Sequence, residues 1–305
     1  MLGIIVSALA FVLIMLVSGN NLPACTGSII ASNIVTKKWG VLLAIMGYLS
    51  GLFAEGSLLG RGVYSLMPFR SNELVIIALS VAIVIFLIAH KMRVPQSLSI
   101  TFAFSILGIT LALGRRPDML FTSEMLLFWV AAFLFAIPFS IFVMNTLKKR
   151  VNRRRIWSSM HKIKIALVVA SFFAAFTLGA NTIGFVYYTL PHSIYNDAAV
   201  ILAIIAGSIL FSGGELRRIG NEIIPIRYIN SFTTQFVSVV LVECATLFGI
   251  PVSNTQMFTA SVYGAGIGYK NRIIREKPAI AIAGTWIGTA LVGFFASYLL
   301  VYLFA

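Results

Sequence analysis

Long stretches without a charged residue decide which class of fold is open to this chain. Five runs contain no Asp, Glu, Lys or Arg: residues 1–36, 125–147, 165–196, 244–269 and 278–305. A helix needs roughly 20 apolar residues to cross the hydrocarbon core of a bilayer, so each run is long enough for one crossing. The sequence therefore predicts an all-α, polytopic membrane protein.

The composition agrees with this class and excludes others. Of the 305 residues, 59% are hydrophobic and 10% are charged, whereas a soluble domain carries about 25% charged residues. The net charge of +14 does not indicate nucleic-acid binding, because the basic residues lie in short connectors between apolar runs, as topology signals do. Cys25 and Cys244 both fall in apolar segments, so neither a disulfide framework nor a metal site is expected.

A basic connector at residues 148–164 divides the chain into two transmembrane repeats, residues 1–147 and 165–305. Its eight cations predict a cytoplasmic position: Lys148, Lys149, Arg150, Arg153, Arg154, Arg155, Lys162 and Lys164. If each repeat crosses the cell membrane an odd number of times, the repeats have inverted topology and both termini lie outside. The first segment, residues 1–17, lacks a basic n-region and is interpreted as a membrane segment rather than a removed signal.

About ten to twelve membrane segments are expected, some of them broken or re-entrant. The longer apolar segments are residues 1–18, 39–59, 73–90, 122–147, 164–180, 196–214, 229–249 and 279–303. Shorter, interrupted pieces lie at residues 20–36, 96–113, 182–192 and 252–269.

Two stretches 156 residues apart are versions of one segment. The matched positions are Pro95 with Pro251, Ser97 with Ser253, and Gly108 with Gly264. A second pair lies upstream, where Gly19-Asn20-Asn21 resembles Gly179-Ala180-Asn181-Thr182. Duplicated halves that are interrupted by small polar residues in mid-span are typical of secondary transporters.

The interruptions predict an anion site. Glycine and proline, as in residues 19–23, disfavour a helix interior by about 1 and 3 kcal/mol, so breaks are expected at residues 19–23 and 179–182. Pro95 and Pro251 suit a first helical turn, beside hydroxyls at positions such as Ser99 and Thr255. Two helix N-termini that meet at mid-membrane could hold an oxyanion without a basic side chain.

The alternative is that these small residues only allow helices to pack closely, as they often do in bilayers. Close packing alone would explain any one serine or glycine of the pattern. Packing alone, however, does not require Asn beside Gly together with Pro-x-Ser-x-Ser/Thr in both halves. The repetition at matching positions therefore favours a binding site.

Residues 251–256 (Pro-Val-Ser-Asn-Thr-Gln), followed by Gly264-Ala265-Gly266, resemble the Pro-Val-Ser-Thr-Thr-His…Gly-x-Gly signature of the inorganic phosphate transporter (PiT) family. Residues 20–28 and 179–187 resemble that family's two Asn-Asp segments. The resemblance covers nearly the whole chain. It implies two inverted repeats, a possible homodimer and transport of inorganic phosphate, often coupled to sodium or protons. The implied substrate ligands are Asn20, Asn21, Ser97, Ser99, Asn181, Thr182, Ser253, Asn254 and Thr255.

The chain also departs from the family pattern. Asn21 and Thr182 stand where the family has aspartates, and Gln256 stands where it has histidine. The loss of both carboxylates weakens the case for sodium and favours protons as the coupling ion. A carboxylate accepts the proton of hydrogen phosphate but repels sulfate, so neutral residues weaken discrimination between the two anions. Phosphate is the first expectation and sulfate the alternative.

Four further residues are candidates for ion coupling, because intramembrane carboxylates are functional by default. Glu55 and Glu215 occupy matching places 160 residues apart, Glu243 lies deeper in an apolar segment, and Gln235 stands where the family tends to carry a polar or acidic residue. The alternative for Glu55 and Glu215 is an interfacial position, neutralised by Arg61 and by Arg217 or Arg218.

Other classes of function fit less well. No Gly-x-x-x-x-Gly-Lys-Ser/Thr loop occurs, which argues against ATP drive within the chain. An enzyme would need convergent titratable groups, and the chain has three scattered histidines and few intramembrane carboxylates. No enzymatic activity and no cofactor are expected. An anion channel and a non-transporting membrane sensor or scaffold remain as alternatives.

Overall fold

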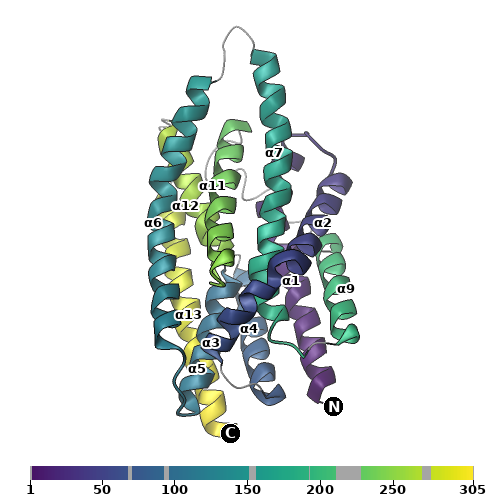
Figure 1. Ribbon diagram of the computed structural model, residues 1–305, viewed down its shortest axis with the longest axis vertical. Helices are drawn as coiled ribbons and strands as arrows, with labels where there is room; N and C mark the ends of the chain where they lie inside the picture. Colours follow the sequence, from purple (N-terminus) through teal and green to yellow (C-terminus); the bar gives the residue numbers. More distant parts are fainter. Residues whose placement is uncertain are drawn as a thin grey trace.

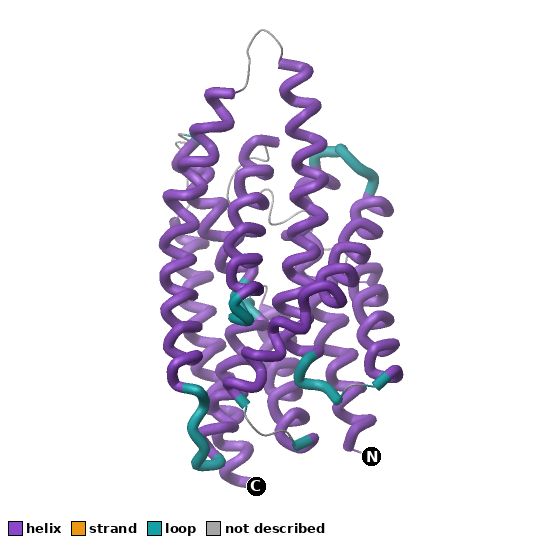
Figure 2. The backbone as a smooth tube through the Cα atoms, in the orientation of Figure 1, coloured by secondary structure: helices purple, strands orange, loops and turns teal. Residues whose placement is uncertain are grey.

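The computed structural model describes residues 2–67, 71–92, 96–150, 156–191, 193–210, 228–269 and 276–304. All regular elements within these ranges are helical (Figures 1 and 2). They are α1 (Leu2–Ala31), α2 (Lys37–Glu55), η1 (Gly56–Leu58), α3 (Leu59–Leu66), α4 (Asn72–Met92), α5 (Leu98–Ala112), α6 (Met119–Arg150), α7 (Ile156–Leu178), η3 (Gly179–Ile183), α8 (Gly184–Tyr187), α9 (Ile194–Leu210), α11 (Tyr228–Leu247), α12 (Asn254–Gly268) and α13 (Glu276–Phe304).

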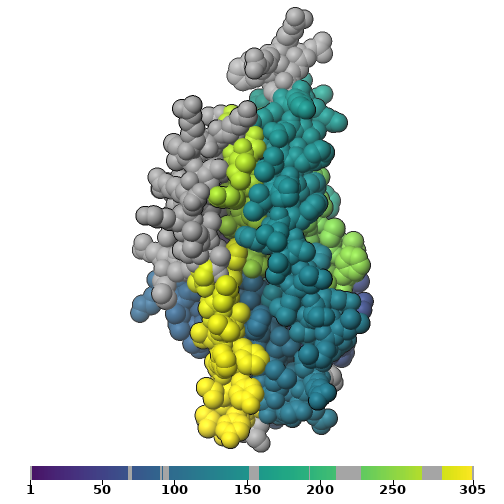
Figure 3. Space-filling model, turned by 90° about the vertical axis from the view of Figure 1, so that its left-hand side faces the viewer, coloured from purple at the N-terminus to yellow at the C-terminus, as the bar shows by residue number. Residues whose placement is uncertain are grey.

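Six of the described helical segments are long and apolar enough to cross a bilayer. They are Leu2–Ala31, Lys37–Leu66, Asn72–Ala89, Met119–Arg150, Ser158–Tyr187 and Gly284–Leu303. Large apolar side chains of α6, such as Leu127, Val130 and Phe142, are at least 60% exposed. Figure 3 shows the face that α6 forms with α12 and α13. Because such a surface suits lipid rather than water, the prediction of a polytopic, multi-pass membrane protein is confirmed.

The short helices α5 and α12 both begin near the middle of the molecule and run toward opposite ends (Figure 1). Each packs closely against a long helix of the other repeat. A Cβ atom added at Gly108 would lie 2.3 Å from the Phe294 carbonyl oxygen of α13, and one at Gly264 would lie 2.4 Å from the Ile137 carbonyl oxygen of α6. The two contacts match each other at sequence offsets of 156 and 157 residues, as duplicated halves predict.

The predicted helix break at residues 19–23 is wrong, whereas the regular α-helix is interrupted at residues 179–182. α1 continues through Pro23, and the second stretch is a π-helical turn, η3, between α7 and α8. Both stretches are buried in protein, where neighbouring groups compensate for a lost helical bond. Gly179 serves close packing, since an added Cβ would lie 2.1 Å from the Tyr48 carbonyl oxygen. The pieces at residues 96–113 and 252–269 do match α5 and α12.

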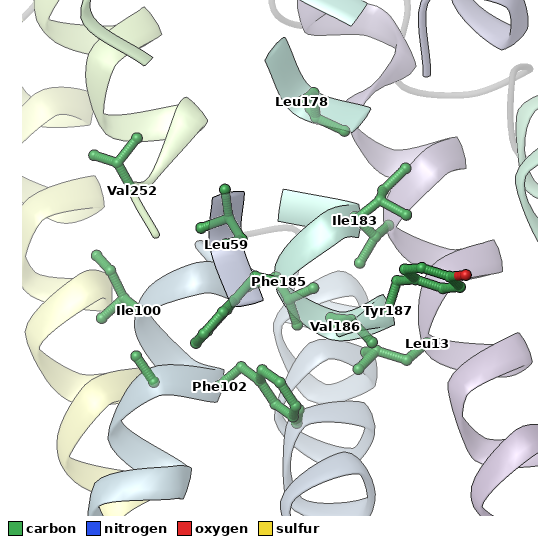
Figure 4. Packing of buried hydrophobic residues seen from close by; sticks show 14 of the residues in the cluster. Leu13, Leu59, Ile100, Phe102, Leu178, Ile183, Phe185, Val186, Tyr187 and Val252 are labelled. Atoms are coloured by element: carbon green, nitrogen blue, oxygen red, sulfur yellow. The ribbon is translucent and has the colours of Figure 1, made fainter. Parts of the chain in front are cut away.

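An apolar cluster packs below the start of α5, toward the end of the molecule that holds both termini (Figures 1 and 4). Phe102 of α5 and Phe185 of α8 meet edge to face, with ring centroids 5.4 Å apart. Leu13, Leu59 and Val186 surround them, and all five side chains are fully buried. The end of α6 and the beginning of α7 lie at the opposite end of the molecule (Figure 1).

Candidate functional site

The helices α5 and α12 begin with the same capping geometry. Ser97 Oγ accepts a hydrogen bond from the amide of Ile100 at 3.3 Å, and Ser253 Oγ accepts one from the amide of Gln256 at 3.1 Å. The two serines are 3% and 1% exposed, so both helix N-termini lie inside the protein rather than in lipid. A first helical turn has amides without an intrahelical partner and a partial positive charge. Each start is therefore suited to an anion.

The π-helical turn η3 contacts both of these starts. Ser99 Oγ of α5 donates to Thr182 Oγ1 at 3.5 Å. On the other side, the amide of Val252, just before α12, donates to Asn181 Oδ1 at 2.8 Å. Single π turns inside helices often occur at functional sites. The structure thus joins predicted site residues of the two repeats through one five-residue turn.

Asn181 uses its whole amide to hold the connector between α11 and α12. Besides accepting from Val252, its Nδ2 donates to Thr246 Oγ1 at 3.0 Å and to the Ile250 carbonyl at 2.9 Å. Trp129 of α6 fixes the same connector by donating to the Pro251 carbonyl at 2.7 Å. Asn181 is fully buried, and its geometry is that of a residue that positions the start of α12.

The remaining predicted ligands of α12 form a short polar network. Ser253 Oγ and Thr255 Oγ1 lie 3.0 Å apart, and Asn254 Oδ1 accepts from Ser238 Oγ of α11 at 3.3 Å. On α1, Asn21 Nδ2 donates to the Val17 carbonyl at 3.0 Å within its own helix, and Asn20 is its half-buried neighbour. Since α1 packs against η3, these two asparagines belong to the same region of the fold.

Two candidate coupling residues meet across the fold. The carboxyl groups of Glu55, at the end of α2, and Glu243, in α11, interact with each other. Both side chains are half-buried, and one oxygen of each is buried without a hydrogen-bond partner in the described part of the chain. The sequence offset had instead paired Glu55 with Glu215, which lies outside the described residues. No spacing could have revealed the observed pair, because its members occupy unmatched places in the two repeats.

Gln235 joins three helices. Its Nε2 donates to the Cys25 carbonyl at 2.7 Å and to Ser28 Oγ at 3.0 Å, both on α1. Its Oε1 accepts from Ser171 Oγ of α7 at 2.9 Å. The side chain is 1% exposed, so the amide is a fully paired link inside the protein. Within the described ranges, no group of three or more His, Cys, Asp or Glu residues is arranged to hold a metal ion.

Comparison with known proteins gives consistent matches over the whole chain. The model of the phosphate transporter family matches residues 17–297. A candidate phosphate permease of Methanocaldococcus jannaschii is 23% identical, over 96% of this chain and 94% of that protein. The sulfate permease CysP of Bacillus subtilis is 24% identical, over 94% of this chain and 84% of that protein. A solved structure of a sodium-dependent phosphate transporter superposes with a TM-score of 0.79 at 17% identity and covers 99% of this chain and 98% of its own.

Proposed function

Because the chain belongs to the phosphate transporter family, we propose that it carries inorganic phosphate across the cell membrane as a secondary transporter with alternating access. The observation that carries this proposal is the pair of buried, serine-capped helix starts that contact one π-helical turn. Such a site offers donors and positive potential, which a phosphate requires. The family and the fold indicate a transporter rather than an enzyme.

The proposed ligands act as hydrogen-bond donors rather than as fixed charges. The amides of the first turns of α5 and α12 face the anion, together with hydroxyls at Ser97, Ser99, Thr182, Ser253 and Thr255 and amides at Asn20, Asn21 and Asn254. Asn181 contributes by holding the start of α12. Hydrogen bonds to a charged group are worth about 1.5–3 kcal/mol each, so a few of them suffice to hold the anion reversibly.

Sulfate is the second candidate, and the neutral side chains of Asn21 and Thr182 favour it. A carboxylate would accept a hydrogen bond from hydrogen phosphate and would repel sulfate, which has no proton to donate. The neutral side chains of Asn21 and Thr182 do not repel sulfate in this way. The relatives do not separate the two anions, since one is a candidate phosphate permease and the other a sulfate permease at nearly equal identity. Phosphate remains the first choice because the family model describes phosphate transporters.

Uptake of labelled phosphate into proteoliposomes tests this function. We expect saturable uptake that unlabelled phosphate reduces more strongly than an equal excess of sulfate, with a modest difference because Asn21 and Thr182 are neutral. A stronger reduction by sulfate than by phosphate would instead identify a sulfate permease. Conductance without saturation would indicate a channel, and anion binding without uptake would indicate a sensor.

We further propose that transport is coupled to protons through Glu55 and Glu243. Two facing carboxylates repel each other in a medium of low dielectric, and one shared proton removes that repulsion. A sodium ion bound between the two carboxylates would also remove their repulsion. The solved structure that resembles this chain is named a sodium-dependent phosphate transporter. Gln235 is a neutral amide whose hydrogen bonds are all made within the protein. It offers no negative charge to a sodium ion, which favours protons as the coupling ion.

The substitution Glu243→Gln tests the coupling. We expect uptake to lose its stimulation by an inward proton gradient, while exchange of labelled for unlabelled phosphate at equal pH persists. A variant of an exposed residue elsewhere, Glu124→Gln, serves as the control and should keep its response to the gradient. Stimulation of the unsubstituted protein by a sodium gradient alone would contradict proton coupling.

The orientation follows from the basic connector. Both termini lie at one end of the molecule, and the end of α6 and the start of α7 lie at the other (Figure 1). With residues 148–164 in the cytoplasm, the termini are outside the cell. The homodimer that the family resemblance implies stays a prediction.

A further inference from the structure

Several polar side chains in the described part of the chain have a buried atom without a hydrogen-bond partner, and four of them lie on α6, α11 and α12, which pack against one another. These four are Ser140 of α6, Asn230 and Thr233 of α11, and Ser261 of α12, here called the inner polar cluster. Asn230 is 6% exposed and the other three are fully buried. An unpaired buried polar group costs about 1–3 kcal/mol, and more than 90% of such groups are paired. Four of them in one region of the molecule point to a polar ligand.

Helix geometry places Asn230 and Ser261 at nearly the same depth. The bond from Ser238 to Asn254 marks where α11 and α12 meet, near the capped start of α12. The two helices run in opposite directions from this contact. Asn230 lies eight residues back along α11 and Ser261 seven residues on along α12, so both are about 11 Å from it at 1.5 Å per residue. Ser140 reaches the same part of α12, since its Cβ lies 2.8 Å from a Cβ atom added at Gly264.

A polar face of α11 connects the inner polar cluster with the proposed binding site. Asn230, Thr234 and Ser238 follow one another at intervals of four residues, which places them on the same side of the helix. All three are less than 10% exposed. The last of them bonds to Asn254 at the start of α12. Hydrogen-bonding groups thus extend from the capped helix starts toward the connector side of the molecule.

In the first repeat, the serine at the corresponding position has hydrogen-bond partners within the protein. Ser105, which matches Ser261 at an offset of 156 residues, donates to the Thr101 carbonyl at 2.9 Å and to the Gly293 carbonyl at 3.4 Å. Beside it on α5, the contact between Phe102 and Phe185 lies within the apolar cluster (Figure 4). The matched serines Ser105 and Ser261 therefore differ in their hydrogen bonding, whereas Ser297 of α13, which matches Ser140 at an offset of 157 residues, is buried without a partner among the described residues as Ser140 is.

Two lysines lie at the outer end of this polar face. Lys148 donates to the carbonyl of Gly268, the last residue of α12, at 2.6 Å, and its Nζ lies 4.7 Å from the centre of the Tyr269 ring. Lys164 lies over the ring of Tyr228, the first residue of α11, at 5.0 Å. Positive charge at this position raises the local concentration of anions.

We propose that the inner polar cluster is a second oxyanion subsite, through which the substrate passes between the capped helix starts and the connector side. This inference rests on the proposed function and adds to it a route and the residues that line it. The ligand is an inorganic oxyanion, phosphate or sulfate, held by hydroxyl and amide donors.

The substitution Asn230→Leu separates a subsite from a structural role. Because Asn230 has no partner to lose, we expect an unchanged or higher unfolding temperature, together with an initial rate of phosphate uptake that falls about tenfold through loss of one hydrogen bond to the anion. A residue that only packs would give the reverse, a lower unfolding temperature and unchanged uptake, and that outcome would overturn the proposal.

Accessibility gives an independent test with a matched control. In a Cys244→Ser background, Ser261→Cys and Ser105→Cys are treated with a water-soluble thiol reagent. We expect Ser261→Cys to react about tenfold faster than Ser105→Cys, and phosphate or sulfate to slow its reaction, since polar and apolar surroundings differ in water access. Equal rates, or no reaction at Ser261→Cys, would overturn the subsite. Uptake by the unsubstituted protein is measured separately: its absence would reject the proposed function, while anion-protected labelling would still support the subsite.

Discussion

Alanine at both Asn181 and Ser253 is expected to abolish phosphate uptake while the protein still inserts and folds. Ser253→Ala removes the cap that accepts from the Gln256 amide, and Asn181→Ala releases the Val252 amide and the connector before α12. The start of α12 is then no longer held in the geometry that the anion requires. Each lost hydrogen bond to a charged group costs about 1.5–3 kcal/mol, so uptake of labelled phosphate should fall to background.

Two exposed hydroxyls of α6 provide the control. Ser123 and Thr146 bond only to carbonyls within their own helix, at 2.8 and 2.9 Å. The double variant Ser123→Ala and Thr146→Ala therefore removes the same number of polar side chains without removing a hydrogen bond of the candidate site, and it should transport normally. Normal uptake by the Asn181 and Ser253 double variant would reject the capped helix starts as the binding site.

The second large effect is expected from Gln235→Glu. The amide nitrogen of Gln235 faces two oxygens, those of the Cys25 carbonyl and the Ser28 hydroxyl. A carboxylate oxygen in its place would face the Cys25 carbonyl without a proton between them, and an uncompensated buried charge costs about 3–5 kcal/mol. In sodium-free buffer at neutral pH, we expect the variant to lose uptake and to unfold at a lower temperature.

A cation would relieve the same defect. Oxygens of a carboxylate, a carbonyl and a hydroxyl are ligands for hard cations, so sodium should raise the unfolding temperature of Gln235→Glu and restore part of its uptake. The neutral variant Gln235→Leu loses the same hydrogen bonds but gains no charge, and sodium should leave it unchanged. If sodium affected both variants equally, the carboxylate would not be the cause.

The parts of the site that depend on local chemistry could be predicted from the sequence. Pro-x-Ser at residues 95–97 and 251–253 indicated helix starts, and Ser97 and Ser253 do cap α5 and α12, but Pro251 lies two residues before its cap rather than in the first helical turn. The same reasoning failed at Pro23, because helix propensity is a weak local preference that burial against neighbouring helices overrides. Gly179 begins the π-helical turn that interrupts the regular helix, and it also leaves room beside Tyr48.

The parts that depend on tertiary contact could not be predicted. Glu55 and Glu243 have unmatched places in the repeats, so the offset that pairs so many other residues does not connect them. Likewise, Asn181 was a plausible ligand by its motif, but only the fold reveals that its amide is occupied by Thr246, Ile250 and Val252. Repeat symmetry points to a candidate site, and long-range contacts show which of its side chains are already hydrogen-bonded within the protein.

The crossed contacts of Gly108 with Phe294 and of Gly264 with Ile137 bear on how such a protein could arise. Each short helix is sheltered by a long helix that the other half supplies, so neither half alone completes its own packing. A shorter ancestor built from one copy would have had to associate as two subunits that exchanged helices. Fusion of two such copies into one polypeptide would make that exchange intramolecular and would leave each copy free to diverge, in the way that Ser105 and Ser261 differ in their hydrogen bonding.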